Sequence, residues 1–458
     1  MKEWLVFLDQ LLWDGCLIYL LLGVGIYLTV RLRGMQVRYL PYALKLALFR
    51  RDNNALGDIS QFQSLMTALA ATIGIGSIAG MATAVMAGGF GAIFWMWVVA
   101  LIGMVTKYAE AILAVKFRKV DAKGEMCGGP MHYIEQGLGW KWLSISFAVF
   151  GTLSAFAGGN LTQSNSIAAA MHEMFAVPHL ISGTVLAVIS AAVILGGIRW
   201  LGRFNAVLVP VMALIYIAGG LVILALKVDQ IPASFGLIFQ HAFTRQAAVG
   251  GFLGAGVMSA IQLGIVRGIS SNEAGLGSAP IAAAAAKTDV PGRQALISMT
   301  GVFLSSFIVC TITVLVICVT GVFGTTDAAG LPLNGAPLVI RAFESVIPGG
   351  SWIVAIGIVL FGFSTILGWS YYGEKCLEYL TKGRYILPFR LLFVGVTLVG
   401  STLSLDVVWA LVDIMNGLMA FPNLIALFFL SPIIIQESRT FFRLVQQEKE
   451  LGISVKGF

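Results

Sequence analysis

Long hydrophobic runs separated by short polar loops dominate the chain. Most have roughly 17–25 residues, the length that an α-helix needs to cross the hydrocarbon core of a bilayer. The pattern therefore predicts about eleven membrane-spanning helices. The runs lie near 13–31, 61–88, 91–115, 142–171, 181–198, 204–226, 247–284, 295–322, 350–373, 386–402 and 406–435. A shorter apolar segment, 336–347, predicts a helix packed over one face of the bundle.

Composition agrees with this pattern. The chain has 458 residues, of which 58% are hydrophobic and 11% charged, whereas soluble domains have about 25% charged residues. We therefore expect an all-α polytopic membrane protein that forms one domain over 1–458. The first run is followed by Arg31 and Arg33 and has no small-residue cleavage site, so we expect a retained span. Five cysteines without CxxC spacing and four scattered histidines indicate neither a disulfide framework nor a metal cluster.

One of the long runs is interrupted at 268–280, GISSNEAGLGSAP. Glycine weakens a helix and proline removes a backbone donor, so this stretch is expected to unwind. Irregular backbone at membrane depth is tolerated only where it is buried in protein or lines a wet cavity. The interruption therefore predicts a functional site.

A second interruption, TIGIGSIAG at 72–80, lies about 200 residues earlier. Helix-packing glycines are the alternative explanation for Gly74, Gly76 and Gly80, because small residues are common where membrane helices touch. A pair of glycine-interrupted spans in corresponding halves, however, is typical of secondary transporters. Exposed helix ends at such breaks offer N–H groups to an anion and carbonyl groups to a cation.

The distribution of charge predicts topology. When loops are assigned to alternate sides, most of the 29 basic residues fall on one side, which we predict to be cytoplasmic. This places the N-terminus outside and the C-terminus in the cytoplasm, and it makes binding of nucleic acid improbable as an explanation of the net charge of +7. The groups 61–226 and 247–435 then hold five spans each with opposite orientation, which predicts an inverted repeat. The helix at 13–31 lies outside the repeat, and 436–458 is predicted to be a cytoplasmic tail.

Other polar groups in the spans are candidate ligands. Gln163 and Asn160 share a helix face and serve either as interhelical hydrogen bonds or as substrate contacts. Ser364 or Thr365 could offer oxygen to a hard cation such as sodium, while Trp369 could wall a small pocket.

Charged residues in the spans have several interpretations. Lys107 and Glu110 are three residues apart and are predicted to pair with each other. Glu273 is predicted to hold the unwound backbone rather than to ligate a substrate. Asp413 and Asn416 share a face without an assigned role. The sequence holds no Ser–His–Asp set, phosphate loop or HExxH motif, so a membrane enzyme is not indicated.

Several motifs resemble the alanine or glycine:cation symporter family. The most specific is NEAGLGSAP at 272–280, and the resemblance continues through FWMW at 94–97, TKYAE at 106–110, GGPM at 128–131 and FSTILGWSYYGE at 363–374. It covers nearly the whole chain. It implies a bacterial or archaeal inner-membrane importer with a LeuT-like fold, a five-plus-five inverted repeat with two unwound helices. It also implies sodium as the coupling ion, no organic cofactor, and alanine of either hand or glycine as substrate.

The resemblance also implies the site residues. The substrate pocket would involve Thr72, Gly74, Gly76, Ser77, Gln163, Ser271, Asn272, Gly275, Thr365 and Trp369. Sodium would lie at Thr72, Ile75, Ser364 and Thr365. This chain has Ser77 where the family usually has asparagine and Ala283 where it often has histidine. The first change alters the ligand geometry, and the second argues against a proton relay there.

Three functions are therefore weighed. The first is sodium-coupled uptake of small neutral amino acids by alternating access. The second is a proton-coupled symporter of the same fold for another small zwitterion. The third is a passive channel, although no charged or carbonyl ring repeats in the sequence. The preferred substrate, the stoichiometry and the oligomeric state are not determined by the sequence.

Overall fold

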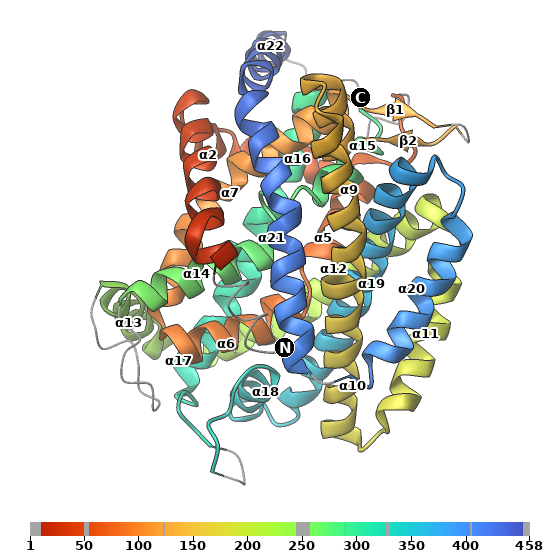
Figure 1. The fold of residues 1–458 in the computed structure, drawn as a ribbon. Coiled ribbons are helices and arrows are strands. Elements are labelled where there is room, and N and C mark those ends of the chain that lie inside the picture. Colours follow the sequence, from red (N-terminus) through yellow and green to blue (C-terminus); the bar gives the residue numbers. More distant parts are fainter. Residues whose placement is uncertain are drawn as a thin grey trace.

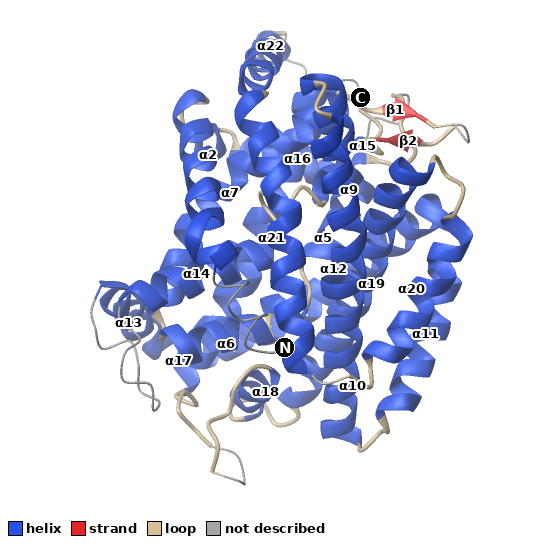
Figure 2. Cartoon of the chain, in the orientation of Figure 1, coloured by secondary structure: helices blue, strands red, loops and turns tan. Residues whose placement is uncertain are grey.

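A computed structural model describes residues 11–49, 55–121, 124–243, 257–288, 290–326, 330–403 and 405–451. These residues form a bundle of helices with one short β-hairpin (Figure 1; Figure 2). The hairpin, β1 (Lys119–Val120) and β2 (Met126–Cys127), lies at one end of the bundle with α22. We call this the hairpin end. The amphipathic helix α18 (Ala336–Glu344), which corresponds to the predicted segment 336–347, lies across the opposite end.

The helices of the first half follow the predicted runs closely, with breaks and π-helical turns inside some of them. They are η1 (Trp13–Leu17), α2 (Ile18–Arg31), α3 (Met35–Arg38), α4 (Leu40–Phe49), α5 (Gln61–Thr72), η2 (Ile75–Ser77), α6 (Ala79–Gly88), α7 (Gly91–Lys116), α8 (Pro130–Tyr133), η3 (Ile134–Leu138), α9 (Lys141–Phe156), η4 (Ala157–Leu161), α10 (Thr162–Phe175), α11 (His179–Ile194), α12 (Gly197–Leu226), η5 (Val228–Gln230) and α13 (Ile231–Phe243).

The second half of the chain also consists of helices, some of them interrupted or containing π-helical turns. Besides α18, its helices are α14 (Val257–Asn272), α15 (Ala279–Ala284), α16 (Pro291–Val302), η6 (Phe303–Cys310), α17 (Thr311–Thr320), α19 (Gly350–Thr381), α20 (Ile386–Gly400), α21 (Leu405–Phe429) and α22 (Ser431–Glu450).

Six of the described helical segments are long and apolar enough to cross a membrane by themselves. The two broken helices, α5–α6 and α14–α15, are not among them because each half is short. Exposed large apolar side chains such as Leu180, Val188 and Leu391 cover the outside of the bundle, as expected where hydrocarbon replaces water.

Several segments differ from the predictions or add to them. Helices α3, α4 and α13 were not predicted, and the segment predicted as a tail from residue 436 belongs to α22, which extends to Glu450. The predicted unwinding of 268–280 is wrong at its start, because α14 stays helical through Asn272. Gly268 serves packing there, since a Cβ at that position would lie 3.1 Å from the Met96 side chain. The part of the predicted span at 247–256 lies outside the described residues.

Helix α7 runs through the middle of the bundle and contacts α14, α15, α16 and α2. The predicted extra helix, α2, lies directly against it, since a Cβ at Gly25 would meet the Ile102 side chain at 2.2 Å. Helix α7 carries Lys107 and Glu110, so its position brings both charged side chains to the second broken helix.

Candidate functional site

The first broken helix loses its regular winding between Thr72 and Ala79. Helix α5 begins with a capping box at Ser60 and Gln63 and ends at Thr72. Gly74 then adopts an extended conformation before a single 3₁₀ turn, and α6 starts at Ala79. We call residues 73–78 the first break.

Gln163 holds the first break from the side. Its Oε1 accepts a hydrogen bond from Ile75 N at 3.4 Å, and its Nε2 donates to Gly158 O at 3.2 Å. The second bond reaches a π-helical turn, η4, inside the long helix α9–α10. Such turns are frequent at functional sites because they free local backbone groups. The predicted run 142–171 therefore contains a π-helical turn near its middle.

The second broken helix loses its winding between Asn272 and Ala279, and we call residues 273–278 the second break. Three of its residues have a positive φ: Glu273 at 54°, Gly275 at 91° and Gly277 at 81°. Glycine adopts this conformation at little cost, whereas glutamate does not. The backbone at Glu273 must therefore be held by its surroundings.

Buried charged groups provide that support. Glu110 Oε1 accepts hydrogen bonds from Gly275 N and Gly277 N, both at 3.1 Å, and from Asn423 Nδ2 at 2.6 Å. Lys107 Nζ donates to Asn272 O at 2.9 Å. The predicted direct pair between Lys107 and Glu110 is therefore replaced by contacts of both side chains with the second broken helix.

Glu273 itself closes the second break. Its Oε2 accepts from Ser278 Oγ at 2.7 Å, and its Oε1 accepts from Trp369 Nε1 at 2.9 Å. The side chain thus bridges both ends of the break and ties it to α19. This geometry is the one expected of a residue that holds unwound backbone.

The two broken helices contact each other. Ser77 Oγ lies 3.2 Å from Ser271 Oγ, and the latter lies 2.9 Å from Cys310 Sγ. Ser77 and Cys310 are fully buried, and Ser271 nearly so. The two interruptions found in the sequence are therefore neighbours in space.

A cavity of about 60 Å³ lies between the two breaks. Backbone and side chains of five helical segments contribute to its wall. It is lined by Ala71, Thr72, Gly74, Gly76, Gly158, Thr162, Gln163, Ser270, Glu273, Leu276, Thr365, Trp369, Val412, Asp413 and Asn416.

Six of the ten predicted substrate residues line this cavity, namely Thr72, Gly74, Gly76, Gln163, Thr365 and Trp369. The other four lie behind the wall. Ser77 and Ser271 contact each other, Asn272 Nδ2 donates to Ser306 Oγ at 3.3 Å, and Gly275 N is bonded to Glu110. From the second broken helix, Ser270, Glu273 and Leu276 face the cavity instead.

The predicted sodium residues form two groups. The hydroxyls of Ser364 and Thr365 each lie 3.1 Å from Ala70 O, near the end of α5. Thr72 lies at the cavity wall, where its Oγ1 donates to Ala68 O at 2.7 Å. Hydroxyl and carbonyl oxygens in this arrangement are suitable ligands for a hard cation.

Two larger hollows lie along the first broken helix on either side of the cavity. One, of about 490 Å³, is lined at the start of α5 by Asp58, Ser60 and Gln63. The other, of about 380 Å³, is lined by Ala79, Gly80 and Thr83 of α6. The first broken helix therefore lines one hollow at its start, the cavity at its break and the other hollow beyond the break.

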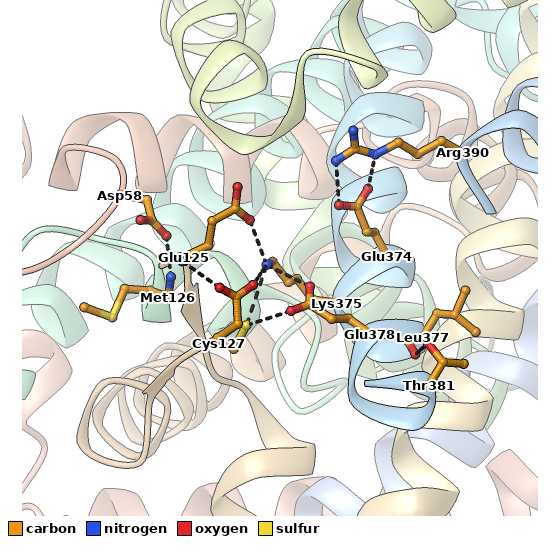
Figure 3. Close-up of polar contacts among 11 residues, drawn as sticks. Asp58, Glu125, Met126, Cys127, Glu374, Lys375, Leu377, Glu378, Thr381 and Arg390 are labelled. Carbon is orange, nitrogen blue, oxygen red and sulfur yellow. Dashed lines mark hydrogen bonds and ion pairs between the residues drawn. The ribbon is translucent and has the colours of Figure 1, made fainter. Parts of the chain in front are cut away.

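An ionic cluster fastens the hairpin end (Figure 3). Lys375 Nζ of α19 lies 3.1 Å from Glu125 Oε2 and 2.9 Å from Glu378 Oε2. The neighbouring Met126 N donates to Asp58 Oδ2 at 2.6 Å, which attaches the hairpin to the start of the first broken helix. The cluster therefore joins α5, the hairpin and α19.

Asp121, Cys127 and Glu378 in this cluster have ligand atoms within 4.8 Å of one another. Burial raises the pKa of the Cys127 thiol to about 12, so the thiol remains protonated at neutral pH. It donates to Glu378 Oε1 at 3.2 Å, and Lys375 already supplies the cation. These contacts fit a structural ionic cluster.

Several wall residues were not predicted to form the site. Asp413 and Asn416 line the cavity from α21, and Asn423, two turns further along, bonds to Glu110. The signal was a polar stripe at spacings of three and seven in an otherwise apolar run, which places all three on one helix face. The first two were noted in the sequence without a role, because only the tertiary structure shows which face meets the cavity.

A helical bundle with two adjacent broken helices around a small buried cavity defines the class of secondary transporters. A solved structure shares the fold: the chain has a TM-score of 0.55 with MhsT in complex with L-phenylalanine, at 14% identity over 84% of this chain and 99% of that one. The fold is therefore LeuT-like, as predicted.

Comparison of sequences gives the family. Residues 1–454 match the sodium:alanine symporter family, and the chain belongs to it. The sodium/alanine symporter AgcS of Methanococcus maripaludis is 52% identical, with 96% of this chain and 97% of the relative covered. The amino-acid carrier protein AlsT of Bacillus subtilis is 35% identical over 91% and 87%. The protein is thus a membrane transporter and not an enzyme, which confirms the resemblance found in the motifs.

Proposed function

We propose that the protein imports small neutral amino acids, alanine of either hand and glycine, together with sodium. The observation that carries this proposal is the cavity of about 60 Å³ enclosed by the two breaks. A water-sized group needs about 10–15 Å³ of such space, so the cavity has room for roughly four to six non-hydrogen atoms. Glycine and alanine are of this size, whereas larger amino acids exceed it.

The polarity of the wall fits a zwitterion. The first break presents backbone N–H groups at Gly74 and Gly76, which suit the substrate carboxylate. The side-chain oxygens of Gln163 and Thr365, with carbonyl groups freed at the first break, suit the ammonium group. Trp369 closes one wall and limits the length of the substrate side chain.

Sodium is proposed to bind between the end of α5 and the hydroxyls of Ser364 and Thr365, with Thr72 and the backbone of Ile75 nearby. The two hydroxyls already converge on Ala70 O. A cation at this place would stabilise the first break in the conformation that surrounds the substrate. By linkage, substrate affinity then rises with sodium concentration, and uptake follows the sodium gradient.

Transport requires the cavity to open toward either hollow in turn. We take the hairpin end as the cytoplasmic side, because basic residues gather in cytoplasmic loops, and we propose a bacterial or archaeal inner membrane with the N-terminus outside. The ionic cluster around Lys375 would then close the cytoplasmic pathway in this conformation. Its contacts to Asp58 and the hairpin would separate when the cavity opens inward.

Uptake of labelled alanine into proteoliposomes tests the proposal. An inward sodium gradient should drive accumulation, and replacement of sodium by choline at fixed pH should abolish it. A matched proton gradient without sodium should not replace it. Equal uptake with and without sodium would contradict sodium coupling, and accumulation driven by protons would support the second candidate instead.

A competition panel tests the substrate class. Unlabelled L-alanine, D-alanine and glycine should inhibit uptake, and phenylalanine and glutamine should not, because the cavity is too small for them. Inhibition by glutamine as strong as that by alanine would contradict the size argument while leaving sodium coupling intact.

A further inference from the structure

A second hollow at the hairpin end has a chemistry different from that of the transport pathway. It measures about 410 Å³ and lies between the end of α2, the short helix α3 and the last helix, α22. Figure 1 shows α2 and α22 rising to the same end of the bundle. We call this hollow the arginine cleft.

Five guanidinium groups line the arginine cleft and come from two parts of the chain separated by about 400 residues. No aspartate or glutamate is among its lining residues. The arginines are Arg31, Arg33, Arg38, Arg439 and Arg443. All five are exposed, and within the described part of the chain none has a carboxylate within 4.0 Å.

The nearby carboxylates of α22 are bonded elsewhere. Glu437 pairs with Lys116, and Glu448 pairs with the buried Arg293 at 2.8 Å. Glu450 accepts from Gln446 Nε2 at 3.1 Å. The arginine cleft therefore keeps its positive charge.

Stacked aromatic rings form a firm floor. Tyr39 stacks on Phe442 with ring centroids 4.3 Å apart and planes 14° apart. Tyr108 lies parallel to the same Phe442 ring, and its hydroxyl donates to Ser438 at 3.2 Å. This packing fixes α3 and α22 relative to α7. The packing of these helices therefore sets the shape of the cleft.

The position of the cleft points to the membrane. Helix α2 exposes large apolar side chains along its outer face, including Tyr19, Ile26 and Val30. Arg31 follows directly, at the end of this apolar surface. A cleft that carries positive charge where a lipid-facing helix ends is at the level of lipid headgroups.

We propose that the arginine cleft binds the phosphate headgroup of an anionic phospholipid. Guanidinium groups donate two parallel N–H bonds to phosphate oxygens, which suits this ligand better than a point charge does. The acyl chains would lie along the apolar outer face of α2. A free phosphate ion would use only the charge, whereas a phospholipid uses both surfaces, so the occupant is the lipid. Bound lipid would link α2 and α3, which lie outside the inverted repeat, to α22.

The test is calorimetric titration of the purified full-length protein in a neutral detergent with dioctanoyl phosphatidylglycerol. The triple variant Arg38→Gln/Arg439→Gln/Arg443→Gln removes three cleft charges. At about 1 kcal/mol for each basic residue near an anionic lipid, affinity should fall on the order of 100-fold. The matched control, Lys141→Gln/Lys382→Gln/Arg384→Gln, removes three exposed charges outside the cleft and should bind within about twofold of the unmodified protein.

Three outcomes would overturn the proposal. Equal loss of affinity in both triple variants would show attraction by net charge alone. Equal binding of dioctanoyl phosphatidylcholine would remove the requirement for an anionic headgroup. Inorganic phosphate that binds as tightly as the phospholipid would identify a free-ion site. A thermal unfolding scan of each variant, compared with the unmodified protein, ensures that lost binding reflects the cleft and not misfolding.

Discussion

The two breaks look alike in sequence but are held in different ways. The first break contacts neutral groups, among them Gln163 Oε1, and two of its residues, Gly74 and Gly76, line the cavity. The second break is held by charged side chains, because Glu110 bonds to its backbone, Lys107 bonds to Asn272 O directly before it, and Glu273 spans it. Charge-assisted hydrogen bonds are stronger and better oriented than neutral ones.

This difference assigns a separate role to each break. Backbone groups of the second break are bonded to the protein, so that segment serves as a fixed wall. The first break keeps glycines at the cavity and is the better place for a substrate that must bind and leave. Changes at the supports of the second break should therefore act mainly on stability, and changes at the first break mainly on transport.

The largest effect is expected for Glu110→Ala. The variant removes the acceptor of three hydrogen bonds and leaves the buried N–H groups of Gly275 and Gly277 without their acceptor. Each buried donor that loses its partner costs about 1–3 kcal/mol. The thermal unfolding midpoint in detergent should drop sharply, with a smaller drop for Glu110→Gln, which keeps one oxygen acceptor.

Glu437→Ala is the matched control for this variant. It removes a carboxylate from a pair near the surface, because the partner side chain of Lys116 is 37% exposed. An exposed pair contributes about 0–1 kcal/mol. If both alanine variants lowered the unfolding midpoint by a similar amount, the contacts of Glu110 with the second break would contribute no more to stability than a surface ion pair.

The next effect is expected for Trp369→Phe, which removes the N–H donor to Glu273 Oε1 and keeps an aromatic wall. A hydrogen bond to a charged group contributes about 1.5–3 kcal/mol. We expect a lower unfolding midpoint and a higher KM for alanine, because Glu273 also lines the cavity. Trp142→Phe in α9, where the ring is 66% exposed, should change neither; a change of KM in that control would remove the link to the second break.

The sequence predicts features that depend on local interactions better than features that depend on long-range contacts. Glycine and proline act locally, so both interruptions were found, and the periodicity of the runs gave the helical bundle. The partners of Lys107 and Glu110 were predicted wrongly because both lie on α7 and their proximity along the chain suggested a mutual pair. Their true partners lie about 165 residues away on α14 and the second break. The site contributions of Asp413 and Asn423 depend equally on long-range packing.

A change at the first break should affect transport more than stability. A Cβ at Gly74 would lie 2.6 Å from Thr365 Oγ1 and 3.4 Å from Gln163 Oε1. Gly74→Ala therefore overfills the cavity wall, which costs about 1–3 kcal/mol in the closed conformation. Alanine uptake should fall roughly tenfold. Gly80→Ala, where nothing lies within 4 Å of the added Cβ, should keep uptake within about twofold; equal losses would mean that any bulk along this helix blocks transport.

The smallest effect is expected where the two broken helices touch. Ser77→Ala removes the hydroxyl that lies 3.2 Å from Ser271 Oγ, while Ser271 keeps its contact with Cys310. A hydrogen bond between membrane helices contributes about 0.6 kcal/mol on average, so affinity for sodium or alanine should change by about threefold. Binding of each ligand, measured with and without the other, shows whether this contact couples them. The contrary outcome is a variant that still shows the same increase in alanine affinity with sodium, and in sodium affinity with alanine, as the unmodified protein. In that case the first break responds to its ligands independently of the second break, which then serves only as a fixed wall of the cavity.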